Sequence, residues 1–468
     1  MRATVQSRIH QYEAHLRRPM TIDGMPGAYY GWTYRIGVLL GFVTTFLTLF
    51  FLQEAIWPRG RDAEPGLEQF VSYLSITWVL PLPPAILGFI GLMIYRRPMH
   101  PGRRARHIDT LVSFRVVTRG TNQRALVATV RNIHATMAAE PLCPYRVEVV
   151  TDRRLDLPRH QSTYQIVVPS DYRPPNGSLY KARALHYALT ASNIGDDAWI
   201  MHLDEESHIT RSLIMGLVDA IREEEASGRF RIGQGAILYH RNMASRRFLT
   251  LADMIRTGED LGRFHLQHRL GLTLFGLHGS FILVRNSVER DVGFDFGPVG
   301  SLTEDAFWAL RQMERGRRCR WVDGYLVEQS CHSVRDFIKQ RRRWFIGLAL
   351  VALKAPSPLR WRAALAISTG LWSISWIAVL YTYLNLATGL NTALPLQLAG
   401  DFVFAFYLVE YVLGLKLNLD HMAPVGRLPA ARLYVTQVAL VPVFQLLEGV
   451  SVLYGLIRPD VHFHIVRK

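Results

Sequence analysis

Long apolar runs lie near both ends of the chain, and the stretch between them mixes polar and apolar positions over short distances. Residues 36–53, 69–95 and 363–400 contain no charged side chain. A helix needs about 20 apolar residues to cross a bilayer. The first two runs therefore predict two membrane-spanning helices, and the third predicts one helix followed by an outer loop.

Two weaker apolar segments, residues 394–415 and 433–457, follow near the C-terminus. Each carries one carboxylate, Glu410 and Glu448, and an acid at membrane depth is a functional candidate by default. The simpler interpretation is that each acid faces other helices or an interface. Pro442 and Glu448 allow either a full crossing or a partial insertion of the last segment, so the side that holds the C-terminus stays open.

The central segment alternates strand-like with helix-like runs. The strand-like runs are residues 111–118, 146–151, 164–168 and 198–203, and the helix-like runs are residues 123–137, 178–191 and 210–225. This alternation predicts an α/β domain with a largely parallel sheet. Ligands of open α/β sheets bind beyond the carboxyl ends of the strands. Thr118, Arg119, Asp152 and Asp204 fall at such ends, so we expect them near a bound ligand.

The same pattern divides the chain into five parts. These are a cytoplasmic lead, two transmembrane helices, a soluble domain, an interfacial segment and a C-terminal region of about three membrane segments. Their predicted bounds are 1–35, 36–95, 96–340, 341–362 and 363–468. The first 30 residues are polar and charged, so we expect no cleavable signal in them.

The chain is strongly basic, with 54 Lys and Arg against 38 Asp and Glu. Such an excess is compatible with nucleic-acid binding, but many arginines cluster beside the apolar runs. They are Arg96, Arg97, Arg103, Arg104, Arg106, Arg341, Arg342, Arg343, Arg360 and Arg362. Basic flanks mark the cytoplasmic side of membrane helices. We therefore expect a multi-pass integral membrane protein whose soluble domain faces the cytoplasm and which contacts membrane lipids and no nucleic acid.

Three clusters of charged residues carry candidate chemistry, and the first is Asp204-Glu205-Glu206 at the end of a strand-like run. A strand that delivers Asp204 and Glu206 to one place supplies two hard oxygen ligands. Mg²⁺ and Mn²⁺ favour such ligands and keep coordination positions for phosphate oxygens. The simpler alternative is that Glu205 and Glu206 are acids near a helix N-terminus, favoured by the helix dipole.

The second cluster is Thr303-Glu304-Asp305 at the start of a helix-like run. A carboxylate at Asp305 is a candidate general base if a hydroxyl comes within hydrogen-bonding distance. The structural alternative is a capping box, because Ser301 and Glu304 have the spacing of that motif and acids suit a first helical turn.

The third cluster, Gln340 to Trp344, precedes the third apolar run. Arginine offers a fork of donors that matches phosphate, and Trp344 offers a flat face for a sugar ring. The alternative is an interfacial segment with arginines at lipid headgroups and a tryptophan in the aromatic belt. One segment can serve both purposes. His278 and Gly279 lie in a glycine-flanked loop that would admit a substrate closely, although a structural histidine is the commoner finding.

In combination these clusters resemble the processive family 2 glycosyltransferases, which include cellulose, chitin and hyaluronan synthases. The resemblance is closer to egghead-type β-1,4-mannosyltransferases. It rests on FRVVTRG (114–120), VEVVTD (147–152), KARAL (181–185), HLDEE (202–206), GLHGSF (276–281), GSLTEDAFWAL (300–310), EQS (328–330) and DFIKQRRRW (336–344). It covers residues 111–347. Two positions depart from the family pattern, since Glu206 replaces the second aspartate of the usual pair and Cys331 stands where we expect proline.

This resemblance implies an α/β glycosyltransferase-A fold, a nucleotide-sugar donor, a divalent cation (Mg²⁺ or Mn²⁺) and inversion at the anomeric carbon. It implies that Asp305 is the general base, with Glu304 beside it as a second catalytic residue, and that Asp204 and Glu206 hold the metal. The implied donor-binding residues are Thr118, Arg119, Asp152, Lys181, Asp204, Gln340, Arg343 and Trp344. The implied acceptor-binding residues are His278, Gly279 and Trp344.

We therefore expect transfer of a sugar, mannose from GDP-mannose in the first instance, to a lipid-linked or glycan acceptor. The alternative within enzymes is a processive synthase that uses a UDP-sugar and exports its polymer, for which about five helices is a small number. The alternative outside enzymes is a nucleotide-binding membrane scaffold or transporter.

Overall fold

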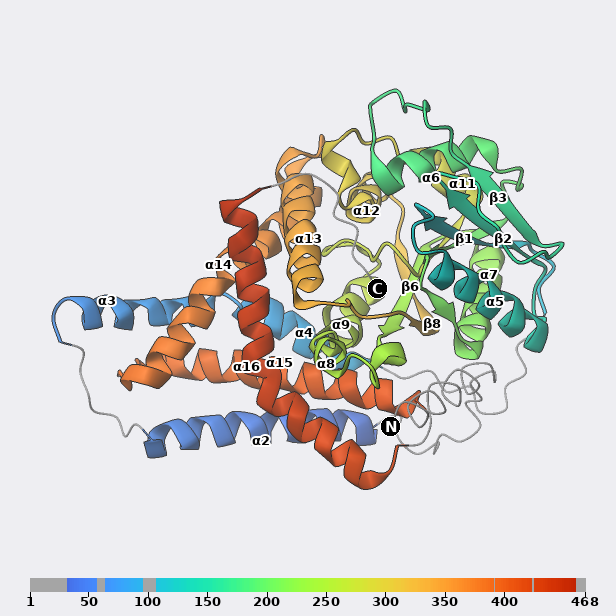
Figure 1. Cartoon of the computed structure of the whole chain (residues 1–468). Helices are drawn as coiled ribbons and strands as arrows, with labels where there is room; N and C mark the ends of the chain where they lie inside the picture. The colour runs from blue at the N-terminus through green and yellow to red at the C-terminus, as the bar shows by residue number, and fades with distance from the viewer. Residues whose placement is uncertain (1–31, 57–63, 96–106, 391, 423–424, 460–468) are drawn as a thin grey trace.

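The computed structural model describes residues 32–56, 64–95, 107–390, 392–422 and 425–459. An α/β domain lies beside a set of long helices, and helix α13 (Val334–Lys354) stands where the two parts meet (Figure 1). The predicted lead up to residue 31 and the arginine cluster at 96–106 lie outside the described residues.

Five helical stretches among the described residues are long and apolar enough to cross a membrane. Two precede the α/β domain: α2 (Trp32–Ile56), and the stretch made of α3 (Leu67–Tyr73), η2 (Leu74–Val79) and α4 (Leu82–Ile94). Three follow it: α14 (Leu359–Thr388), α15 (Leu394–Asp420) and α16 (Arg427–Ile457). Helix α16 continues through Pro442 as a single helix.

The α/β domain is built on one eight-stranded sheet with the order β3-β2-β1-β4-β7-β6-β8-β5. The strands are β1 (Val112–Thr118), β2 (Tyr145–Thr151), β3 (Thr163–Val167), β4 (Trp199–Asp204), β5 (His208–Ile209), β6 (Ile232–Leu238), β7 (Ile282–Arg285) and β8 (Cys319–Val327). The helices between them are α5 (Gln123–Ala139), α6 (Tyr180–Ala191), α7 (Arg211–Ser227), η3 (His240–Asn242), α8 (Arg247–Ala252), α9 (Met254–Glu259), η4 (Asp260–Phe264), α10 (His265–Arg269), α11 (Asn286–Val292), η5 (Val299–Ser301) and α12 (Glu304–Glu314).

The predicted parallel arrangement holds among β3, β2, β1 and β4, and β6 also pairs in parallel with β8. Strand β1 pairs in parallel with both β2 and β4, and β2 pairs in parallel with β3. Strand β7 is antiparallel to β4 and β6, so the sheet is mixed rather than largely parallel. The chain reaches β7 after the long excursion through α8 to α10, which returns it to the sheet in the opposite direction.

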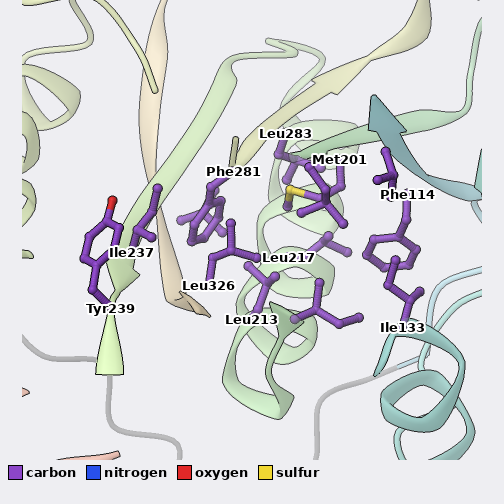
Figure 2. Close-up of a cluster of buried hydrophobic side chains, with 14 of the residues drawn as sticks. Phe114, Ile133, Met201, Leu213, Leu217, Ile237, Tyr239, Phe281, Leu283 and Leu326 are labelled. Carbon is purple, nitrogen blue, oxygen red and sulfur yellow. The ribbon is translucent and has the colours of Figure 1, made fainter. Parts of the chain in front are cut away.

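One face of the sheet packs against α7. Phe114, Met201 and Leu283 are neighbours in register on β1, β4 and β7, and all three are buried. They form a row that meets Leu213 and Leu217 of α7 (Figure 2). Alternation with a period of two places these apolar side chains on a common face.

A buried charge network lies beside this row. Arg115 has no exposed surface, and its guanidinium contacts Glu148 at 2.9 Å and Glu289 at 2.5 Å. His202 Nε2 lies 2.6 Å from Glu289 Oε2. Arg115 is in register with both Glu148 on β2 and His202 on β4. A one-residue slip of any of these strands would separate the charges in a medium where unpaired charge is costly, so the network favours a single register.

The segment from α9 to η4 packs tightly on the membrane helices. A Cβ added to Gly414 of α15 would collide with the carbonyl oxygen of Met254, and one added to Gly91 of α4 would collide with that of Gly262. Glycine at these places permits backbone-to-backbone approach. The side chains of α9 and η4 are therefore held at the junction between the sheet and the membrane helices.

We predict that Arg115→Met lowers the free energy of unfolding by about 3–5 kcal/mol, because it leaves buried Glu148 and Glu289 without their cation. Thermal unfolding of the detergent-solubilised protein measures this as a lower melting temperature. The control is Arg290→Met, which removes an ion pair with Asp196 whose side chains are 36% and 68% exposed and which we expect to change stability by less than about 1 kcal/mol. Equal melting temperatures for the two variants would contradict the prediction.

Candidate active site

One cavity of about 680 Å³ brings together every residue that the sequence predicts for the site. These residues are Thr118, Arg119, Asp152, Lys181, Asp204, Glu206, His278, Gly279, Glu304, Asp305, Gln340, Arg343 and Trp344. They come from strand ends, helix starts and one loop that are far apart in sequence. The structure therefore places them in one chamber, and their individual contacts indicate what each can do.

The ends of β1 and β2 form one wall of the cavity. The Thr118 hydroxyl donates to the Glu205 carboxylate. Asp152 accepts a hydrogen bond from Arg183, and the Arg119 guanidinium lies 3.9 Å from its other oxygen. Arg183 was not predicted for the site, because it lies two positions after Lys181 on α6 and so faces another direction. Asp152 thus stands between two guanidiniums at a strand end.

Lys181 is the centre of the site. Its ammonium lies 2.6 Å from Asp204 Oδ1, 2.7 Å from the carbonyl oxygen of Gly279 and 3.7 Å from Glu304 Oε1. Burial alone would lower the pKa of this ammonium, but Asp204 and Glu304 outweigh burial and raise its pKa above the ordinary value. A protonated Lys181 therefore joins the end of β4, the loop before β7 and the start of α12.

The backbone on either side of this centre is unusual. Tyr180, directly before Lys181, has φ of 52°, and Phe281, just after the glycine loop, has φ of 58°. A non-glycine residue in the left-handed region costs about 1–2 kcal/mol. Such strain persists where surrounding contacts determine the conformation and is common at functional sites. Here the strained residues Tyr180 and Phe281 lie in the two segments that are joined by the hydrogen bond from Lys181 to the Gly279 carbonyl oxygen.

Asp305 lies in the first turn of α12. The N-cap position of this helix is Thr303, and the Ser301 hydroxyl instead donates to the carbonyl oxygen of Gly297, which lies just before η5. The alternative of a capping box from Ser301 to Glu304 is therefore wrong. Burial and, after it, the neighbouring Glu304 raise the pKa of Asp305 to about 7, although Lys181 opposes them. A carboxylate with a pKa near the working pH is suited to accept a proton.

Asp204, Glu205 and Glu206 all line the cavity. No group of three or more His, Cys, Asp or Glu side chains is arranged to hold a metal within the described ranges. Two carboxylates nevertheless suit Mg²⁺ or Mn²⁺, because such ions commonly take one or two protein carboxylates and complete their shell with water and substrate phosphates. Asp204 and Glu206 therefore fit a cation that arrives with a diphosphate, and one oxygen of Asp204 already pairs with Lys181.

The three consecutive arginines of α13 face different partners. Arg341 lies 2.7 Å from both Asp253 and Glu448, and Arg342 stacks on Tyr454 with 4.7 Å between its central carbon and the ring centroid. Arg343 instead lies close enough to Glu304, Asp204 and Asp305 for these acids to support its charge against the burial that lowers its pKa. One segment thus holds the membrane helix α16 and also contributes to the site.

Trp344 and Gln340 have partners within the protein. The guanidiniums of Arg256 and Arg341 lie 4.6 Å and 4.5 Å from the Trp344 ring centroid. The side-chain oxygen of Gln340 accepts from Arg341 at 3.2 Å. The sequence analysis missed Arg256, which also lines the cavity. The indole is therefore a contact point for two cations as well as a wall of the chamber.

Asp260 holds the His278 side chain. Its Nε2 lies 2.5 Å from Asp260 Oδ1, and the other oxygen of Asp260 accepts the Ile237 amide at 2.9 Å. The imidazole also packs on Phe264 at 4.5 Å between centroids. Asp260 escaped the sequence analysis because nothing in its local pattern marks it. The pair orients His278 at the cavity wall, near Asp305.

The same cavity continues between the membrane helices. Its lining there includes Gln53 of α2, Asp401 of α15 and the stretch of α14 from Leu365 to Leu386. Gln53 donates to Asp401 at 2.7 Å. The α14 stretch corresponds to about 30 Å of helix, which is comparable to the hydrocarbon thickness of a bilayer. The chamber that holds the acids is therefore open toward membrane depth.

We predict that Lys181→Met lowers the melting temperature of the metal-free protein, because Asp204, Glu304 and Asp305 lose the cation between them. The expected loss is about 2–4 kcal/mol, measured by thermal unfolding in detergent. Lys354→Met, at an exposed position near the end of α13, is the control and should leave the melting temperature unchanged. A Lys181→Met protein that melts with the wild type would show that the ammonium does not hold these segments together.

Comparison with known proteins identifies the family of the chain. Residues 199–415 match the family described as Glycosyl transferase family group 2. The chain is 30% identical over 404 residues to β-1,4-mannosyltransferase egh of Drosophila melanogaster, covering 84% of this chain and 86% of that protein. It is 31% identical over 425 residues to β-1,4-mannosyltransferase bre-3 of Caenorhabditis briggsae, covering 89% and 92%.

Among solved structures, the chain is similar to mannosyltransferase PcManGT from Pyrobaculum calidifontis in complex with GDP-Man and Mn²⁺. The TM-score is 0.44, the identity is 16%, and the match covers 82% of this chain and 99% of that one. The sequence relatives settle the class, and with it the choice between an enzyme and a binding scaffold. The chain belongs to the family of glycosyltransferases that includes egh and bre-3.

Proposed function

We propose that this glycosyltransferase transfers mannose from GDP-mannose to a lipid-linked glycan, forming a β-1,4 linkage at the cytoplasmic face of a membrane. The names of the sequence relatives support the sugar and the linkage. The observation that carries the choice of acceptor is the single cavity that joins the buried acids to the membrane helices. A lipid tail can lie between the helices while the glycan that it carries reaches Asp305.

The donor would lie along the strand ends. Asp152, with Arg119 and Arg183 around it, would contact the nucleoside, and Thr118 would lie beside it. Arg343 and Gln340 would close over the diphosphate, because a guanidinium matches phosphate geometry. Asp204 and Glu206 would hold Mg²⁺ or Mn²⁺. When bound, this cation would neutralise charge that gathers on the leaving diphosphate.

The chemistry then assigns a proton acceptor. Asp305 takes the proton from the attacking acceptor hydroxyl as the new bond to the anomeric carbon forms and the bond to the diphosphate breaks. GDP leaves with the bonding pair, and Asp305 ends protonated. Attack from the face opposite the leaving group inverts the anomeric centre. Arg343 stabilises the growing negative charge, and His278 and Gly279 hold the acceptor against the base.

The cytoplasmic orientation rests on the basic residues that flank the third apolar run. Arg341, Arg342 and Lys354 lie on α13, and Arg360 and Arg362 lie in the first turn of α14. Basic residues at helix ends favour the cytoplasmic side, which supports a cytoplasmic position of the site.

A second function is favoured by the length of the cavity. Its lining includes polar side chains at membrane depth, among them Gln53, Ser375, Thr382 and Asp401. A processive synthase that uses a UDP-sugar would need such a polar route for a growing polymer. This alternative predicts long products and donor selectivity for UDP-sugars, so the nature of the product separates the two.

The deciding experiment gives the purified protein a panel of GDP- and UDP-sugars, with and without lipid-linked glycans, and identifies the products by mass. We expect single mannose transfer from GDP-mannose that EDTA abolishes and Mn²⁺ or Mg²⁺ restores. Selective turnover of a UDP-sugar, or a polymer series, would refute mannosyl transfer in favour of the synthase. Full activity in EDTA would refute the metal site at Asp204 and Glu206.

We predict that Asp305→Asn binds GDP-mannose normally but transfers at least about 100-fold more slowly, since a general base contributes about that much. Donor titration and initial rates measure the two effects. The rate of the wild type should fall as the pH drops below about 7, because the Asp305 pKa of about 7 leaves the base protonated there. Near-normal transfer by Asp305→Asn would remove Asp305 from this role.

A further inference from the structure

Arg256 lies at the junction between the α/β domain and the membrane helices. It is carried by α9, is partly buried and lines the cavity. Its helix has little freedom to move, because Gly258 and Gly414 allow the backbones of α9 and α15 to touch. The side chain of Arg256 therefore reaches the cavity from a well-packed helix at this junction.

The guanidinium of Arg256 is held by rings. Its central carbon lies 4.3 Å from the centroid of the Tyr239 ring and 4.6 Å from that of Trp344. Ring contacts of this kind stabilise the cation through the faces of its plane. The N–H donors of a guanidinium point outward within the plane, so these contacts leave the donor edges free for another partner.

Those donors have no hydrogen-bond or ion-pair partner among the residues that the structure describes. The neighbouring arginines differ: Arg341 pairs with Asp253 and Glu448, and Arg263 pairs with Glu259. Aromatic rings hold the Arg256 guanidinium in the cavity, and its N–H donors are unused. Such a guanidinium is organised to bind a ligand with paired oxygen atoms.

The charges around Arg256 indicate which kind of oxygen atom it binds. Asp253, Glu328 and Arg341 act electrostatically on Arg256, and Glu448 forms an ion pair with Arg341. The surroundings of Arg256 thus hold three acids, Asp253, Glu328 and Glu448, and one cation, Arg341. This excess of negative charge does not attract a phosphate dianion. Ser280 and Ser207 donate hydrogen bonds to Glu328, so serine hydroxyls, and not the Arg256 guanidinium, hydrogen-bond to this acid. A neutral pair of sugar hydroxyls meets these conditions.

We propose that Arg256 binds adjacent hydroxyl oxygens of the acceptor's terminal sugar and so selects the hydroxyl that reaches Asp305. This inference rests on the proposed function, in which a lipid-linked glycan enters from the membrane side. Trp344 provides the connection to the reaction, because it contacts Arg256 and follows Arg343, which lies near Asp305. Arg256 is therefore a specificity-determining residue for the acceptor and has no part in donor binding.

The experiment compares Arg256→Lys and Arg256→Met with the wild type in the transfer assay. Lysine keeps the charge and loses the fork of donors. We expect the acceptor KM to rise by about 10- to 100-fold in both variants, as befits loss of hydrogen bonds from a charged group. The donor KM and the slow hydrolysis of donor without acceptor should stay within about twofold. We also expect a fraction of the product to carry mannose at another hydroxyl, which linkage analysis detects.

The matched control is Arg285→Met. Arg285 also stacks on an aromatic ring, 4.0 Å from the centroid of Phe230, and it does not line the cavity. We expect Arg285→Met to leave the acceptor KM unchanged. This result would separate the general effect of losing a ring contact from the effect of losing a ligand contact. If Arg256→Met fails to fold, Arg256→Lys still decides the result through the acceptor KM.

The outcomes distinguish this proposal from the proposed function. An unchanged acceptor KM in Arg256→Lys overturns the proposal while wild-type transfer continues. A donor KM that rises in step with the acceptor KM also overturns it, because Arg256 would then serve the diphosphate. A wild type that transfers no mannose to any lipid-linked glycan refutes the proposed function and this inference together.

Discussion

The site depends on one ammonium group among three acids. Asp204, Glu304 and Asp305 come from different segments, and like charges that share a buried volume repel one another. Lys181 lies within 3.7 Å of the first two and binds the Gly279 carbonyl as well. Its charge allows the acids to stay close, yet it leaves Asp305 with a pKa of about 7. The lysine that holds the three acids together therefore leaves Asp305 with a pKa suited to accepting a proton.

A second constraint follows from helix geometry. Successive residues of an α-helix point about 100° apart, so three consecutive arginines cannot all face one ligand. On α13, Arg341 and Arg342 contact α16 while Arg343 faces the acids. The contacts of Arg341 and Arg342 fit the interpretation of this segment as a membrane anchor. Arg343 is placed at the cavity, where we propose that it contacts phosphate. The membrane helices and the site consequently share a structural element.

The sequence predicted the parts of this arrangement that local pattern controls. Strands β1, β2 and β4 end in the polar residues Thr118, Thr151 and Asp204, so the strand-end position of Thr118, Asp152 and Asp204 could be predicted. The antiparallel strand β7 was not, because pairing direction depends on the path of the chain before it. Arg256 and Asp260 were missed for a similar reason. Arg256 contacts Tyr239 and Trp344, and Asp260 contacts His278, only in the folded chain. A family resemblance identifies sequence motifs and does not identify the residues that position them.

Under the proposed function, the junction of α9 and α13 would link recognition of the two substrates. The groups proposed for the donor belong to the strand ends and to Arg343, whereas Arg256 is carried by α9, which packs on α15. Trp344 contacts Arg256 and is covalently next to Arg343, so the ring that holds Arg256 and the group proposed to bind the diphosphate belong to one helix, α13. Helix α9 is in turn held against α15, because the two backbones touch. Under the proposed function, the contact between Trp344 and Arg256 would therefore couple the position of the acceptor to the groups that bind the diphosphate.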